Sequence, residues 1–188
     1  DVGSTVSALS AVINSYGMDA ADAAKVSDMF FETVRLGVTT MSELSQNIGQ
    51  VSPLASQAGV SIEQLLAAYA SLTKQGVNTA IATTQIRGAI TALIKPNTDL
   101  AAALKETFGT ESGTAALKAH GLQVVLNGLA EAVGNDTDKI AKLFPEVRGL
   151  NGVMGLTGPK AEAAAKDLES LKKALGAAGT AFKTMAET

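Results

Sequence analysis

Residues 61–95 read SIEQLLAAYASLTKQGVNTAIATTQIRGAITALIK, and this stretch decides the fold. Ser61 and Gln64 have the spacing of a capping box, in which each side chain bonds a free backbone N–H in the first turn of a helix. The helix that they open carries four large apolar side chains, Leu65, Leu66, Tyr69 and Leu72. It is expected to end at Gly76, because glycine tolerates the left-handed conformation that terminates many helices.

A second helix is predicted directly afterwards, over residues 79–94, in which Arg87 is the only charged residue. Apolar side chains surround it at Ile81, Ile86, Ile90, Leu93 and Ile94. A helix that is apolar on most sides is a buried one, so we expect this helix to be the central element. Pro96 disfavours a helical conformation at Lys95 and ends the run.

The rest of the chain has the composition of an all-α protein made of short helices. Apolar residues make up 46% of the 188 residues but aromatic residues only 4%, and there are only four prolines. Alanine and leucine favour helices because they lose little side-chain freedom there. We expect an array or bundle of helices at about residues 4–16, 19–37, 40–49, 53–58, 100–108, 112–120, 122–133 and 137–144.

The first half of the sequence contains a possible internal repeat. Gly37-Val38-Thr39 ends one predicted helix, and Gly76-Val77-Asn78 ends another about 40 residues later. This self-similarity is consistent with a duplicated helix-pair unit over about residues 17–95. Two copies fall short of the three or more repeats that a stable solenoid generally needs.

The amino-acid composition changes after a series of glycines that ends at Gly158. From Pro159 onward the chain is rich in Ala, Lys and Glu, and apolar residues recur at alternating spacings of three and four, the pattern of a coiled-coil seam. We therefore predict a compact helical core domain over residues 1–158 and the start of an extended coiled coil over residues 159–188. The predicted self-association residues are Leu168, Leu171, Leu175, Phe182 and Met185.

Several residues were weighed as sites of chemistry, and a structural role is favoured for each. The chain has no cysteine and one histidine, His120, which precedes Gly121 and suits the negative end of a helix dipole. Asp136 and Asp138 are spaced like the first two ligands of a calcium-binding loop, but the glycine and the glutamate that such a loop needs further along are missing. Helix capping by Asp136 or Thr137 is therefore expected. No catalytic, cofactor-binding or metal-binding residue is predicted.

The remaining candidates are two carboxylates, an arginine and a glycine series. Asp28 and Glu32 share one face of a helix, which is expected to be solvated rather than to form a glycosidase pair. Arg87 could bind a carboxylate of a partner or cap carbonyl groups within its own bundle, and the internal role is favoured. The series Gly149, Gly152, Gly155 and Gly158 lacks a phosphate-loop pattern, so a close helix contact or a flexible joint is expected.

Charge and hydropathy also limit the possible partners. The net charge is −3, and Lys and Arg are scattered, so specific nucleic-acid binding is not expected. No stretch reaches the roughly 18 apolar residues of a membrane span. The chain begins at Asp1 without a signal-peptide pattern, and we expect a segment of a longer protein.

Several blocks follow one another along the chain: GVTT at 37–40, AGVS at 58–61, GVNT at 76–79, TQIR at 84–87, LIKP at 93–96 and KLFPEVRG at 142–149. In this order they resemble the conserved-core region of phage tail tape measure proteins, the family typified by lactococcal siphophages. The resemblance covers about residues 17–158. Many family members have a Gly-Thr pair where this chain has Thr84-Gln85, and Pro53 interrupts a stretch that is often Ala-rich.

The resemblance implies a non-enzymatic structural protein of a phage tail that takes part in tail assembly and tail-length determination. It also implies self-association into a coaxial oligomer, contacts with the tail tube protein and tail assembly chaperones, and location in the virion tail after assembly in the host cytoplasm. A helical membrane-active or secreted protein is the alternative hypothesis. A tail-associated cell-wall hydrolase is a third.

Overall fold

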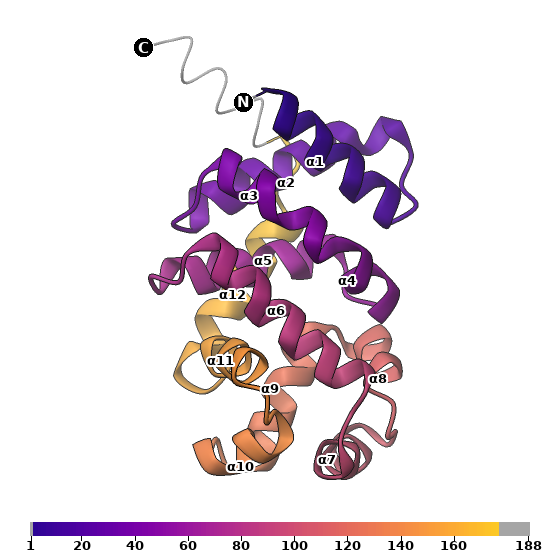
Figure 1. Cartoon of the computed structure of the whole chain (residues 1–188), viewed down its shortest axis with the longest axis vertical. Helices are drawn as coiled ribbons and strands as arrows, with labels where there is room; N and C mark the ends of the chain where they lie inside the picture. The colour runs from indigo at the N-terminus through magenta and orange to yellow at the C-terminus, as the bar shows by residue number, and fades with distance from the viewer. Residues whose placement is uncertain (1, 177–188) are drawn as a thin grey trace.

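A computed structural model describes residues 2–176, and in this part of the chain it contains twelve α-helices, three short 3-10 helices and no strand (Figure 1). The all-α prediction is confirmed. The α-helices are α1 (Val2–Ser15), α2 (Ala23–Leu36), α3 (Met41–Asn47), α4 (Ser52–Ala58), α5 (Ile62–Lys74), α6 (Thr79–Ile94), α7 (Thr98–Phe108), α8 (Gly113–His120), α9 (Leu122–Ala132), α10 (Thr137–Leu143), α11 (Val147–Leu156) and α12 (Ala161–Lys172). The 3-10 helices are η1 (Ala20–Asp22), η2 (Ile48–Gln50) and η3 (Gly158–Lys160).

The helices are stacked along the long axis of the molecule. Helices α1 to α4 occupy one end, α7 and α10 the other, and α5, α6 and α12 lie between them (Figure 1). The two repeated glycine turns are adjacent in this stack: the hydroxyls of Thr39 and Thr79 lie 2.6 Å apart. Val38 also donates its backbone N–H to the Thr73 hydroxyl at 3.1 Å. These bonds join the α2–α3 turn to the α5–α6 turn, while the duplication of the helix pair stays a prediction.

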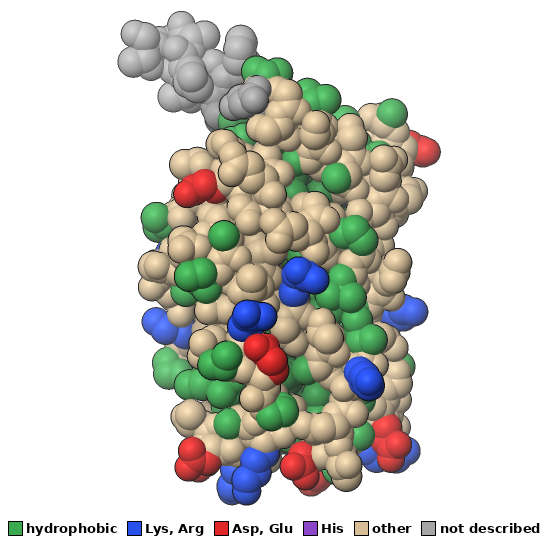
Figure 2. Space-filling model, in the orientation of Figure 1, with side chains coloured by type: hydrophobic (Ala, Val, Ile, Leu, Met, Phe, Trp, Pro, Cys, Tyr) green, Lys and Arg blue, Asp and Glu red, His purple; other side chains and the backbone are tan. Residues whose placement is uncertain are grey.

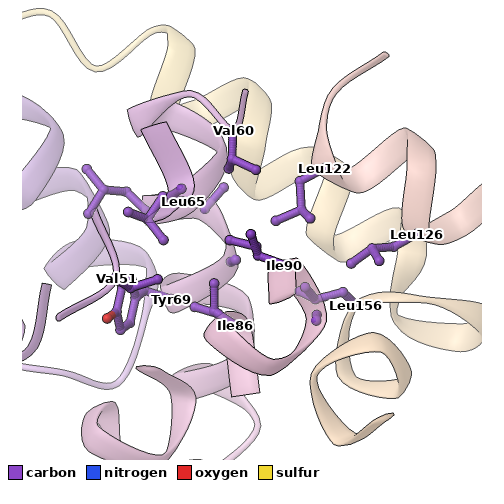
Figure 3. Packing of buried hydrophobic residues seen from close by; sticks show 14 of the residues in the cluster. Val51, Val60, Leu65, Tyr69, Ile86, Ile90, Leu122, Leu126 and Leu156 are labelled. Carbon is purple, nitrogen blue, oxygen red and sulfur yellow. The ribbon is translucent and has the colours of Figure 1, made fainter. Parts of the chain in front are cut away.

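The core is one cluster that extends from α1–α4 through α5 and α6 to α9, α11 and α12, and Figure 3 shows part of it. Tyr69, Ile86, Ile90, Leu126 and Leu156 are each at most 2% exposed and point into it. The predicted centrality of α6 is confirmed for most of its surface. The prediction is wrong for Ile81 and Ile94, which are 48% and 40% exposed and lie with Arg87 on the outward face of the helix.

Both predicted capping boxes are present. The Thr40 hydroxyl accepts from the backbone N–H of Glu43 at 3.1 Å, and the Ser61 hydroxyl accepts from that of Gln64 at 3.2 Å. Pro53 lies in the first turn of α4, where its missing N–H costs no helical hydrogen bond. These short-range signals therefore place α3, α4 and α5 correctly.

Helix α11 was not predicted, because three glycines fall within it. Two of them face α6: a Cβ at Gly149 would lie 2.9 Å from the backbone carbon of Gly88, and a Cβ at Gly152 would lie 2.8 Å from the backbone oxygen of Gln85. The two backbones can approach this closely because glycine has no side chain. For Gly149 and Gly152 the expectation of a close helix contact is confirmed.

The extended coil predicted from Pro159 onward is not confirmed within the described residues. Helix α12 has only 12 residues and packs against α5 as part of the same body. Leu171 is 1% exposed and belongs to the hydrophobic core, and Leu168 packs against this core. Leu175 is 81% exposed, and Phe182 and Met185 lie outside the described residues.

A buried carboxylate attaches α12 to α5. Asp167 is 3% exposed and accepts from the Ser71 hydroxyl at 2.7 Å and from the Lys74 ammonium at 2.6 Å. Removing one member of such a cluster leaves the others desolvated and unpaired. The contact therefore opposes the separation of α12 from the body.

We predict that the glycines of the α6–α11 crossing are required for stability. A Cβ at Gly88 would lie 2.6 Å from the backbone nitrogen of Gly149, so Gly88→Ala should lower the free energy of unfolding by about 1–3 kcal/mol. Gly49→Ala is the control, because a Cβ there would meet nothing closer than the Ala11 side chain at 4.0 Å. Guanidinium unfolding followed by circular dichroism measures both, and equal effects would contradict the prediction.

We also predict that Asp167→Asn lowers the free energy of unfolding by about 1–2 kcal/mol, because the ion pair with Lys74 is lost. The loss is limited because the Lys74 side chain is partly exposed and water can solvate its ammonium group. The control is Glu169→Gln, on the same helix. Its ion pair with Lys172 joins side chains that are 58% and 51% exposed, so the change should be close to neutral. Thermal unfolding of the two variants tests this, and a neutral Asp167→Asn would show that the cluster does not stabilise the docking of α12.

Candidate interaction groove

A groove with a volume of about 470 Å³ opens between α6, the start of α7, the end of α10 and the start of α11. These elements lie in the half of the molecule that is remote from α1 (Figure 1). The floor is apolar and consists of side chains from three of the elements. They are Ala92, Leu100, Leu143 and Phe144.

Cationic side chains border this floor. Arg87 lies on α6, and Lys95 directly follows the last residue of this helix, eight residues or about 12 Å further along. Arg148 lies on α11. All three residues are exposed. In the half that contains the groove, Figure 2 shows Lys and Arg side chains beside hydrophobic ones. The site therefore combines an apolar surface with positive charge.

One carboxylate also lies at the groove, and it has a structural role. Glu146 precedes α11 and accepts from the backbone N–H of Gly149 at 3.0 Å, so its side chain caps this helix. On the other side, the Asn97 amide donates to the backbone oxygen of Lys142 at 3.1 Å. These bonds hold the start of α7, the end of α10 and the start of α11 in position around the floor.

The groove brings together the two blocks 84–96 and 142–149, which are distant in the sequence. The α6–α11 crossing joins them, because Gly88 and Gly149 allow the backbones to touch. Sequence reasoning noted both blocks but did not place them at one site. The periodicity of each block was visible, but no local signal reports which helices cross.

The expectation that Arg87 bonds within its own bundle is wrong. In the described part of the chain its guanidinium makes no hydrogen bond or ion pair, because α6 turns this residue toward the groove. Burial raises the pKa of the Tyr69 phenol, and two effects oppose this rise, the hydrogen bond with Thr83 and the charge of Arg87. The charge of Arg87 thus affects the pKa of a buried residue, although the guanidinium group faces outward.

The solvated face expected for Asp28 and Glu32 is also wrong, since these residues are only 8% and 7% exposed. Asp28 accepts from the backbone N–H of Gly176 at 2.7 Å, so the chain after α12 covers it. Glu32 pairs with Arg35 on the same helix. Both carboxylates thus have structural partners within the described part of the chain.

The other candidates lie where they were expected. His120 ends α8 beside Gly121, and its ring lies 5.0 Å from that of Phe108. Asp136 caps α10 through the backbone N–H of Lys139 at 3.0 Å. Within residues 2–176, no group of three or more His, Asp or Glu side chains is placed to hold a metal ion. None of the helices in this range is both long and apolar enough to span a membrane.

Comparison with known proteins identifies the family. Residues 1–139 match the model of the family described as phage-related minor tail protein. The whole chain is 27% identical over 194 residues to a probable tape measure protein of Clostridium phage phiCD119, covering 21% of that protein. It is 26% identical over 195 residues to the tape measure protein of Pneumococcus phage Dp-1, covering 16% of it.

The chain thus spans about a fifth or less of the length of these relatives. No solved structure matches it. The family match covers well over half of the chain and agrees with the all-α architecture and with the resemblance found in the sequence. The chain therefore belongs to the family of phage-related minor tail proteins.

Proposed function

We propose that this chain is a folded, non-catalytic segment of a tape measure protein, and that it acts in tail assembly while other helical regions of the full-length protein set the tail length. The proposal is supported by two relatives named as tape measure proteins, each of which aligns with the whole chain. The observation that carries the division of roles is the packing of α12 back onto α5.

A ruler must be extended, and the described residues are not. If residues 2–176 formed one helix, it would be roughly 260 Å long at a rise of 1.5 Å per residue. A compact domain of this size has a radius of gyration of roughly 16 Å. The longest helix, α6, has only 16 residues, so adding or removing residues here changes a globular body rather than a length.

The proposed partners follow from the same role. We propose self-association into a coaxial oligomer, with contacts to the tail tube protein and to tail assembly chaperones, in the virion tail and before that in the host cytoplasm. Because Leu168 and Leu171 pack within the chain, the seam between copies begins at Leu175, which is exposed. Phe182 and Met185 continue it in this proposal.

The prediction concerns tail length in the phage that carries this protein. Deleting about 70 residues in frame from a coiled-coil region of the full-length protein should shorten tails by about 105 Å, at 1.5 Å per residue. Gly88→Val in the segment described above should instead lower the yield of tails, because it disrupts the α6–α11 crossing. The tails that still form should have the normal length.

Electron microscopy of negatively stained particles measures both quantities. Gly49→Ala is the control and should change neither yield nor length. Tails that keep their length after the coiled-coil deletion would contradict the ruler. Tails shortened by Gly88→Val would contradict the division of roles.

A further inference from the structure

We propose that the groove between α6, α7, α10 and α11 binds a segment of another protein in which apolar side chains are flanked by carboxylates. The inference rests on the proposed role of this domain in tail assembly and adds the site and the chemistry of the partner.

The arginines of this chain are distributed unevenly. The sequence contains three, at positions 35, 87 and 148. Arg35 is paired with Glu32 three residues earlier on α2. Arg87 and Arg148 both line the groove, and in the described part of the chain neither forms an ion pair or a side-chain hydrogen bond. Two of the three guanidinium groups are therefore available at one site.

The available cations define the charge of the partner. A guanidinium presents its N–H donors in a planar fork that matches the two oxygens of a carboxylate. Lys95 adds a third positive charge to the same rim. The nearby carboxylate of Glu146 accepts from the backbone of Gly149, and it balances only one of the three charges. A protein with a net charge of −3 thus presents a local surplus of positive charge.

The floor defines the rest of the partner. The accessible apolar lining comes from Ala92, which is half-buried, and Pro145, which is exposed, while Leu100 and Leu143 are at most 5% exposed. The volume of about 470 Å³ accommodates one or two apolar side chains. An anion alone would leave this surface uncovered. A segment with apolar residues at its centre and Asp or Glu on both sides covers the floor and pairs with the rim.

A nucleic acid fits the groove less well than such a peptide does. Binding of single strands generally relies on exposed aromatic rings for base stacking and on a continuous basic track. The aromatic ring at this groove, Phe144, is only 1% exposed, and the Glu146 carboxylate lies beside the basic groups. The groove therefore favours carboxylates on a protein over phosphates on a strand.

The test uses a fluorescein-labelled peptide, Glu-Asp-Leu-Phe-Glu-Asp, and fluorescence anisotropy with the 188-residue chain. Saturable binding is expected. Binding should weaken at least about tenfold when Leu-Phe is replaced by Ser-Ser, and likewise when the four acidic residues are replaced by Lys. A single-stranded DNA oligonucleotide of similar length should bind more weakly than the acidic peptide.

Three variants locate the binding. The double variant Arg87→Glu with Arg148→Glu should weaken it at least about tenfold, and Thr91→Trp should weaken it by filling the groove. The matched control is Lys160→Glu with Lys173→Glu, which changes the net charge equally at exposed positions away from the groove. This control should retain most of the affinity, and circular dichroism should show that all the variants are folded.

Four outcomes would overturn the inference: no saturable binding of the acidic peptide, equal binding by the double arginine variant, an equal loss in the lysine control, or tighter binding of DNA. The measurement does not involve tails. If the peptide does not bind but the coiled-coil deletion shortens tails as expected, only the groove inference is overturned. If the peptide binds but the coiled-coil deletion leaves tail length unchanged, only the proposed function is overturned.

Discussion

The rest of the structure depends on the contact between the backbones of α6 and α11. At Gly88 and Gly149 the two helices approach until there is no room for a Cβ on either of them. This contact brings residue 149 to residue 88 and closes the core around Ile86, Ile90 and Leu156. It also fixes the angle at which the Pro145–Glu146 loop meets α6, so the groove is a consequence of the crossing. Small residues thus determine the arrangement, and larger ones fill the space that it leaves.

Much of the fold could be predicted because its signals are local. Thr40 with Glu43 and Ser61 with Gln64 bond within one turn, so their spacing in the sequence is sufficient to locate two helix starts. Pro96 likewise marks the end of α6. The errors concern features that distant contacts decide. The glycines of α11 look like breaks until α6 lies against them, and Asp28 appears to be a surface carboxylate until residue 176 covers it.

The groove could be predicted only in part for the same reason. Its two blocks were recognisable in the sequence, and Arg87 was identified as unusual because no other charge lies on its helix. Of its neighbours at the site, Arg148 lies on another helix and Lys95 directly follows the end of α6. Only the crossing shows that the three cations share one rim. A pattern of single helices contains no information on this, since the same helices could have packed in other pairs.

The final helix shows how similar sequence patterns lead to different structures. A spacing of three and four residues between apolar side chains suits a coiled coil between chains and also a surface helix that packs on its own domain. In α12 the choice is decided by Asp167, because a carboxylate that is 3% exposed requires the donors of Ser71 and Lys74 on α5. In a parallel coil with Leu168 and Leu171 in the seam, Asp167 would flank the seam and pair with Lys172 of the other helix at a solvated edge, which is a weaker interaction than the buried one. The polar cluster therefore favours the intramolecular contact over the seam at this helix, and any coil between copies has to begin beyond it.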